Sequence, residues 1–190
     1  KNGEDVIYKN TDGSLSAQTG SFIAGIISHI KGITAIANPI VNSYKRLGSG
    51  YQAPRYISWS EKNRSQLIRI PAENGEPCRI ELRSPDPACN PYLLIALLME
   101  AGLQSIESGL TAAEKTGINI YKATAHELEK IDQLPGDLLC AVEFMKKDDM
   151  IAGVLGKHLY EKYLVAKLSE WNEYMNVVHS WEIDRYLINV

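Results

Sequence analysis

The chain has 190 residues, of which 45% are hydrophobic and 23% charged, and its formal net charge is −3. This composition is typical of a globular protein and excludes a collagen-like, disordered or disulfide-framed chain. The apolar run at residues 92–99 is far shorter than the roughly 20 residues that cross a bilayer, so no membrane span is expected. Three cysteines without a C-x-x-C pair argue against a zinc module. Because the chain begins with Lys1 and shows no apolar leader, we expect it to be a piece of a longer cytoplasmic product.

Arginine is concentrated in one part of the sequence. Residues 44–83 hold eight basic and four acidic side chains, whereas the rest of the chain is acidic. A planar guanidinium group binds carboxylate and phosphate through two parallel hydrogen bonds, so the cluster favours an anion-binding site. A solvated sheet edge with scattered ion pairs is the alternative, and nucleic acid is not expected because no recognised motif is present. The clustered arginines are Arg46, Arg55, Arg64, Arg69, Arg79 and Arg83.

The first predicted helix begins after Ser16, a good N-cap, and ends at Asn38-Pro39. Its apolar residues recur from Phe22 to Ile36. We expect His29, within this helix, to be a packed or surface residue rather than a ligand.

Short alternating segments follow at residues 55–60, 65–71 and 78–83, and we expect them to form paired antiparallel strands. In the last segment, the period of two places Arg79, Glu81 and Arg83 on one face. A carboxylate between two guanidinium groups is either a structural ion-pair ladder or a metal ligand beside anion-binding arginines.

The C-terminal half is predicted to be helical. Asn90 caps a helix that starts at Pro91, Thr124 and Glu127 form a capping box, and Asp137 caps a further helix. The predicted fold class is therefore α+β, with residues 1–145 as one unit and residues 146–190 as a helical region that contacts another subunit. Its apolar stripe consists of Tyr160, Leu164, Leu168, Trp171, Met175 and Val178.

Five ordered motifs carry a family resemblance. They are NPIVNSYKRL (residues 38–47), GYQAP (50–54), SEKNRS (60–65), IRIP (68–71) and RIELRSPDPACNPYL (79–93). Together they closely resemble bacterial type I glutamine synthetase. The resemblance implies the C-terminal part of that catalytic domain, whose β-grasp domain, paired metal-binding glutamates and histidine metal ligand would precede Lys1.

The resemblance also implies a reaction and a set of roles. The family uses ATP to convert glutamate to γ-glutamyl phosphate, which ammonia then attacks. It implies that Arg64 contacts the transferred phosphoryl group, Arg69 the ATP phosphates and Arg79 the nucleotide, and that Glu81 binds Mg²⁺ or Mn²⁺.

For the other substrates, the resemblance implies that Arg46 and Arg83 bind the carboxylates of glutamate. Gln52 occupies the place of the family's flap glutamate, which binds and deprotonates ammonium. An amide accepts no proton near pH 7, so Gln52 can orient an amine but cannot act as its base. The loop at residues 73–77 is also shorter than in the family and lacks its lysine.

These departures leave alternatives open. The parent protein is either a glutamate–ammonia ligase, a related ligase that joins glutamate to another amine, or a non-enzymatic paralogue that acts in assembly or regulation. The resemblance implies a cytoplasmic homo-oligomer, a dodecamer, with the fragment alone inactive.

Overall fold

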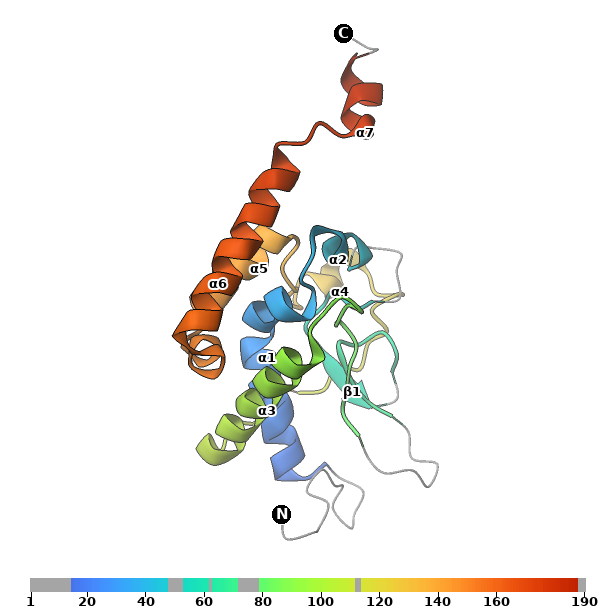
Figure 1. Cartoon of the computed structure of the whole chain (residues 1–190). Coiled ribbons are helices and arrows are strands. Elements are labelled where there is room, and N and C mark those ends of the chain that lie inside the picture. Colours follow the sequence, from blue (N-terminus) through green and yellow to red (C-terminus); the bar gives the residue numbers. More distant parts are fainter. Residues whose placement is uncertain (1–14, 48–52, 62, 72–78, 112–113, 188–190) are drawn as a thin grey trace.

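The computed structural model describes residues 15–47, 53–61, 63–71, 79–111 and 114–187. Helix α1 (Ala17–Ala37) runs through the middle of the molecule (Figure 1). Its N-cap Ser16 accepts a hydrogen bond from the Thr19 backbone N–H at 3.1 Å, and the N–H of Asn38 closes the other end on the Thr34 carbonyl. The predicted limits of this helix are confirmed, because a side-chain cap and a following proline are local signals.

Helix α1 is also the most apolar helix of the described chain. Its 21 residues, with a mean hydropathy of 1.4 over the most apolar window, would be long enough to cross a membrane, but 67% of that window is buried inside the protein. The burial of α1 is that of a core helix.

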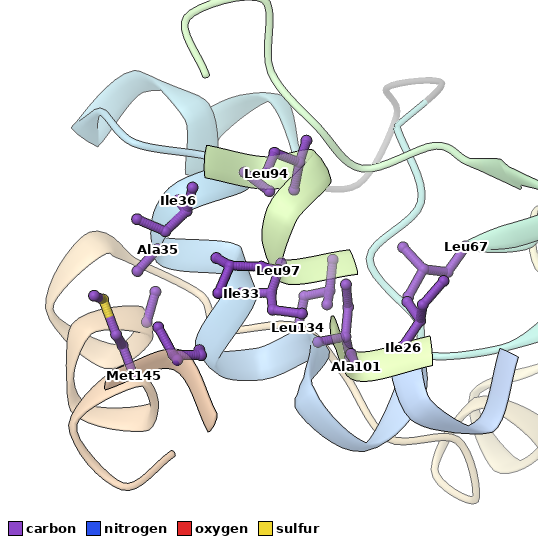
Figure 2. Close-up of a cluster of buried hydrophobic side chains, with 14 of the residues drawn as sticks. Ile26, Ile33, Ala35, Ile36, Leu67, Leu94, Leu97, Ala101, Leu134 and Met145 are labelled. Atoms are coloured by element: carbon purple, nitrogen blue, oxygen red, sulfur yellow. The ribbon is translucent and has the colours of Figure 1, made fainter. Parts of the chain in front are cut away.

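Helices α3 (Pro91–Ser108) and α5 (Leu138–Lys146) pack against α1. Asn90 and Asp137 cap them as predicted, by accepting hydrogen bonds from backbone N–H groups of the first turn. Figure 2 shows the resulting core, in which side chains from α1 and α3 interleave with Met145 of α5 and Leu67 of the sheet region. The labelled members are Ile26, Ile33, Ala35, Ile36, Leu67, Leu94, Leu97, Ala101, Leu134 and Met145.

The crossing of α1 and α3 depends on two glycines. A Cβ atom at Gly25 would overlap the carbonyl oxygen of Ala101, and one at Gly102 would overlap the ring of Phe22. The two backbones therefore approach more closely than any larger residue would allow at these positions.

The sheet has three short strands, β1 (Trp59–Glu61), β2 (Ile68–Ile70) and β3 (Glu81–Leu82), in the order β1-β2-β3. The pair β2–β3 is antiparallel, as predicted, but β1 and β2 are parallel, so the antiparallel prediction is wrong for that pair. The connection between β1 and β2 does not form a hairpin. Its side chains are hydrogen-bonded to the distant segment 118–120.

The expected strand 55–60 is divided between two partners. Residues 55–57 pair with 132–134, through Ile57 N–H to Asp132 O at 2.7 Å and Leu134 N–H to Arg55 O at 2.8 Å. Only Trp59–Glu61 joins the sheet.

The remaining helices are α2 (Val41–Arg46), α4 (Ala125–Leu128), α6 (Asp149–Met175) and α7 (Ser180–Glu182), followed by a π-helical turn at Ile183–Leu187. Thr124 and Glu127 form the predicted capping box of α4. Helix α6 is broken at Gly156, whose φ of 69° is outside the helical region, and it packs against α5 and α3. Beyond α6 the chain projects away from the core (Figure 1). Four residues of the predicted stripe, Tyr160, Leu164, Leu168 and Trp171, lie against the core, whereas Met175 and Val178 are exposed.

This architecture confirms the predicted α+β class, with a small three-stranded sheet that lies between helices in chain order and a helical C-terminal region. The division at residues 145/146 stays a prediction.

Candidate functional site

A carboxylate between two guanidinium groups lies on the polar face of β2 and β3. The strand register places Arg69 directly opposite Glu81, and Arg69 Nη1 donates to Glu81 Oε2 at 3.0 Å. Arg83 Nε lies 3.6 Å from the other oxygen, Oε1. The side chains of Ile68 and Leu82 point to the opposite, apolar face, which contributes to the core. We call Arg69, Glu81 and Arg83 the sheet triad.

The sequence placed Arg79 and Arg83 on either side of Glu81, and the structure corrects this. Residues directly opposite on neighbouring strands are closer than residues two apart on one strand, so Arg69 takes the position expected for Arg79. Arg79 is exposed and has no ion pair with a described residue.

The sheet triad retains capacity for a further anion. Arg69 Nε is buried and has no hydrogen-bond partner within the described chain, while Arg83 Nη1 donates to the Gln66 carbonyl at 3.4 Å. Because this N–H is fully buried, an incoming phosphate oxygen could reach only the exposed part of the two guanidinium side chains. The arginine side chains are about one-sixth exposed and Glu81 is 34% exposed, so the site is reachable from solvent.

Arg64 lies on the exposed turn between β1 and β2 and forms no ion pair with a described residue. The turn itself is firmly held, because Asn63 Nδ2 and Gln66 Nε2 both donate to the Ile118 carbonyl, at 3.0 and 2.8 Å. Ser65 Oγ, which donates to Asn63 Oδ1, accepts a hydrogen bond from the Ile120 backbone N–H. Arg64 thus extends from a turn that these hydrogen bonds hold in place.

The hydrogen bonds between this turn and residues 118–120 were not predicted from the sequence. The Asn-x-Ser turn at residues 63–65 is a local signal that could have revealed the hydrogen bonds within the loop. Nothing local indicates that residues 118–120 would complete it.

Arg46, at the end of α2, is held by two other segments, the end of α1 and residues 84–86. Its Nη2 donates to Asn38 Oδ1 at 3.0 Å and to the Ser84 carbonyl oxygen, and its Nε lies 3.5 Å from Asp86 Oδ2. The chain therefore brings Arg69, Glu81 and Arg83 into direct contact, and Arg46 touches the segment that immediately follows Arg83. Gln52 lies outside the described residues.

His29 belongs to a different part of the molecule. Its Nδ1 lies 2.8 Å from Asp148 Oδ2, at the junction between α1 and the start of α6. This contact fits the packed residue that the sequence predicted, and His29 has no connection with the sheet triad.

The chain offers little to a metal ion by itself. Within the described ranges, no group of three or more histidine, cysteine or acidic side chains is arranged to bind one. Glu81 could contribute one hard oxygen ligand, since each carboxylate oxygen keeps a free lone pair beside its arginine. Further ligands must come from elsewhere, so the fit to Mg²⁺ or Mn²⁺ is partial.

The fold and this face together define a class: an α+β domain whose sheet carries arginines and one carboxylate on its polar face. The chain belongs to the glutamine synthetase catalytic-domain family, because the family model "Glutamine synthetase, catalytic domain" matches residues 1–186. The resemblance inferred from the five motifs is thereby confirmed.

Individual relatives support the same family assignment. The chain is 50% identical to a glutamine synthetase of Methanosarcina mazei and 48% identical to one of Thermus thermophilus, each over 98% of its length. Among solved structures, it is 34% identical to GmaS without ligand, with a TM-score of 0.83, and to a GmaS/ADP complex, with a TM-score of 0.85. In every case the chain spans less than half of the relative, 42% of the Methanosarcina protein and 43% of the GmaS chain with ADP.

Proposed function

We propose that the chain is the C-terminal portion of the catalytic domain of an ATP-dependent glutamate–ammonia ligase, which forms glutamine through γ-glutamyl phosphate. The observation that carries this proposal is the sheet triad, because it joins an acidic oxygen ligand to two anion-binding arginines within the family's own motifs. Relatives named glutamine synthetase, and a structural relative in complex with ADP, support it.

The nucleotide end of the reaction is assigned to four residues. Arg64 would stabilise the transferring phosphoryl group, Arg69 the ATP phosphates, and Arg79 the nucleotide. Glu81 would be one ligand of Mg²⁺ or Mn²⁺, a cation that neutralises phosphate charge when bound. The exposed side chain of Arg64, which has no ion pair with a described residue, supports its role because it is available to an incoming anion.

The glutamate end is assigned to Arg46 and Arg83, each of which would bind a substrate carboxylate. Nη1 of Arg46 has no hydrogen bond to any described residue, whereas Nη2 is already hydrogen-bonded to two oxygens. Such an arrangement suits a fixed cation that accepts a carboxylate at one edge.

A second candidate is a ligase of the same kind that joins glutamate to a larger amine. It is favoured by Gln52, which cannot deprotonate ammonium. An amine that is already neutral when it binds needs no such base.

We further propose a cytoplasmic homo-oligomer, a dodecamer in the complete protein. The exposed apolar side chains of the projecting C-terminal region support subunit contact, since so much apolar surface is unusual for a free monomer. They are Met175, Val177, Val178, Trp181, Ile183, Tyr186 and Leu187.

The test uses the full-length protein that contains this chain. Glutamate-dependent phosphate release from ATP should be measured with ammonia and with a panel of primary amines. Release with ammonia supports the main proposal, and release only with a larger amine supports the second. No glutamate-dependent release with any nucleophile would favour a non-enzymatic paralogue. The 190-residue chain alone should be inactive, since Glu81 cannot hold the metal without partners.

A further inference from the structure

Three segments of the chain meet around the side chain of Arg46. They are the C-terminal end of α1, the end of α2, and residues 84–86, which lead from β3 to α3. The N–H of Asp86 donates to the Ala37 carbonyl at 2.8 Å, so the loop is attached directly to the last residue of α1. Asn38, the C-cap of that helix, is fully buried.

Arginine has five N–H donors, and two of them are hydrogen-bonded in this arrangement. Both hydrogens of Nη2 are directed to oxygens, Oδ1 of Asn38 and the carbonyl of Ser84. The Nε–H is buried and has no hydrogen bond to a described residue, although Nε lies within ion-pair distance of Asp86 Oδ2, at 3.5 Å. The two hydrogens of Nη1 remain, and Arg46 as a whole keeps 31% of its side chain exposed.

Asp86 is itself held on both sides. Its Oδ1 accepts from the Ala88 backbone N–H at 2.8 Å, which leaves Oδ2 for Arg46. Its side chain is only 12% exposed, so the ion pair is poorly screened. The negative end of the α1 dipole, at Asn38, adds to the attraction for the guanidinium group.

We propose that Asn38 and Asp86 are positioning residues that fix the orientation of Arg46, so that its Nη1 edge is presented to a carboxylate of the substrate. This inference rests on the proposed function, in which Arg46 binds glutamate. A free arginine side chain would have to be ordered each time substrate binds, and the frame of Asn38, Ser84 and Asp86 removes that cost beforehand.

Two substitutions in the full-length protein test the frame. Asp86→Asn keeps the size of the side chain and an oxygen for Ala88, but removes the charge opposite Arg46. Asn38→Leu removes the acceptor Oδ1 and keeps the number of side-chain heavy atoms. Each should raise KM for glutamate about tenfold, the equivalent of one hydrogen bond to a charged group, with KM for ATP and kcat changed less than about twofold.

The control is Asp148→Asn. Asp148 is buried to the same degree as Asp86, with 13% of its side chain exposed, and pairs with His29 on another side of the molecule. It should leave KM for glutamate unchanged, so that a general loss of stability is separated from loss of positioning.

The Arg46→Ala background shows whether Asp86 acts through Arg46. With that side chain removed, Asp86→Asn should have no further effect on KM for glutamate, because the group it positions is absent. An undiminished tenfold effect in that background, or no effect of Asp86→Asn in the unmodified protein, would overturn the proposal.

A measurement that needs no activity distinguishes this failure from failure of the proposed function. Hydrogen exchange of the Arg46 Nε–H, followed by NMR, should be slow in the unmodified protein and several-fold faster in Asp86→Asn. Equal exchange rates would overturn the frame, whether or not the protein is a ligase. An altered rate in a protein without glutamate-dependent activity would instead overturn the proposed function and the substrate role of Arg46.

Discussion

Arg69 and Glu81 face each other across β2 and β3, with Nη1 of the arginine 3.0 Å from Oε2 of the carboxylate. Arg83, two residues after Glu81 on the same face, reaches the other oxygen at the longer distance of 3.6 Å. The tightest partner of the carboxylate therefore comes from the neighbouring strand. The geometry of the sheet triad therefore depends on the pairing of β2 with β3.

A double-mutant cycle with Arg69→Met and Glu81→Gln measures that relationship. We expect a coupling free energy of about 0.5–1 kcal/mol in urea unfolding, because the pair is partly exposed and screened by solvent. The matched cycle with Arg79→Met should give coupling near zero, since Arg79 has no ion pair with Glu81. Equal coupling in both cycles would contradict the register described above.

The helix starts could be predicted from the sequence, because each depends on a cap and the residues beside it. Ser16, Asn90, Thr124 and Asp137 all cap the helices that they were expected to cap. The sheet triad could be predicted only in part. The period of two correctly grouped Glu81 with Arg83, but the position of Arg69 depends on strand register, which a short segment does not determine.

The lack of a local sequence signal also explains the other differences between the predicted and the observed contacts. Asn63 and Gln66 donate to a carbonyl more than 50 residues away, and Arg46 is held by Ser84 from 38 residues away. Such contacts follow from the packing of whole elements and have no local pattern.

Gly25 and Gly20 provide a matched test of the α1–α3 crossing. Gly25→Ala should destabilise the protein by about 1–3 kcal/mol, because the added methyl group overlaps the backbone of Ala101. Gly20→Ala, in the same helix with nothing within 4 Å of the new atom, should stabilise it by about 0.5–1 kcal/mol through helix propensity. Thermal unfolding of both variants is the measurement. Stabilisation by Gly25→Ala would show that the helices are not in close contact there.

Tyr44 and Tyr163 differ in a single hydrogen bond. The Tyr163 hydroxyl donates to the Ala35 carbonyl at 2.8 Å, whereas the buried hydroxyl of Tyr44 has no partner in the described chain. Tyr163→Phe should therefore cost about 1 kcal/mol at pH 7, and Tyr44→Phe should be neutral or slightly stabilising. A larger cost for Tyr44→Phe would contradict this assignment.

These tyrosines also predict an alkaline limit to stability. Burial raises the pKa of both phenols above the ordinary value of 10. Because the folded pKa is raised, the stabilising contribution is complete below about pH 10 and is lost as the unfolded tyrosines ionise at higher pH. Tyr44→Phe should reduce the slope of unfolding free energy against pH above that value, which urea titrations at pH 8 to 11 would reveal.

Arg64 and Arg83 should give different kinetic profiles in the full-length protein. If Arg64 stabilises charge that develops on the transferring phosphoryl group, Arg64→Ala should lower kcat by roughly 10² to 10³ and change KM for ATP much less. Arg83→Ala should mainly raise KM for glutamate, since a carboxylate is bound in ground and transition states alike. Identical profiles would contradict the two roles.

Gln52 allows the two candidate reactions to be separated. If the protein is an ammonia ligase limited by an amide in place of the family's glutamate, Gln52→Glu should restore a negative charge beside the ammonium site. The value of kcat/KM for ammonia should then rise, with the largest gain below about pH 8, where most ammonia is protonated and needs a base.

A different result is expected if the native nucleophile is not ammonia. If the native nucleophile is a larger amine that binds in its neutral form, Gln52→Glu should leave kcat/KM for that amine unchanged or lower it, because a new carboxylate must be desolvated beside an apolar ligand. Steady-state kinetics with ammonia and with the preferred amine, at pH 6.5, 7.5 and 8.5, would distinguish the cases. Should neither nucleophile respond at any pH, Gln52 does not lie at the amine site, and the correspondence between this loop and the family's flap is one of sequence position alone.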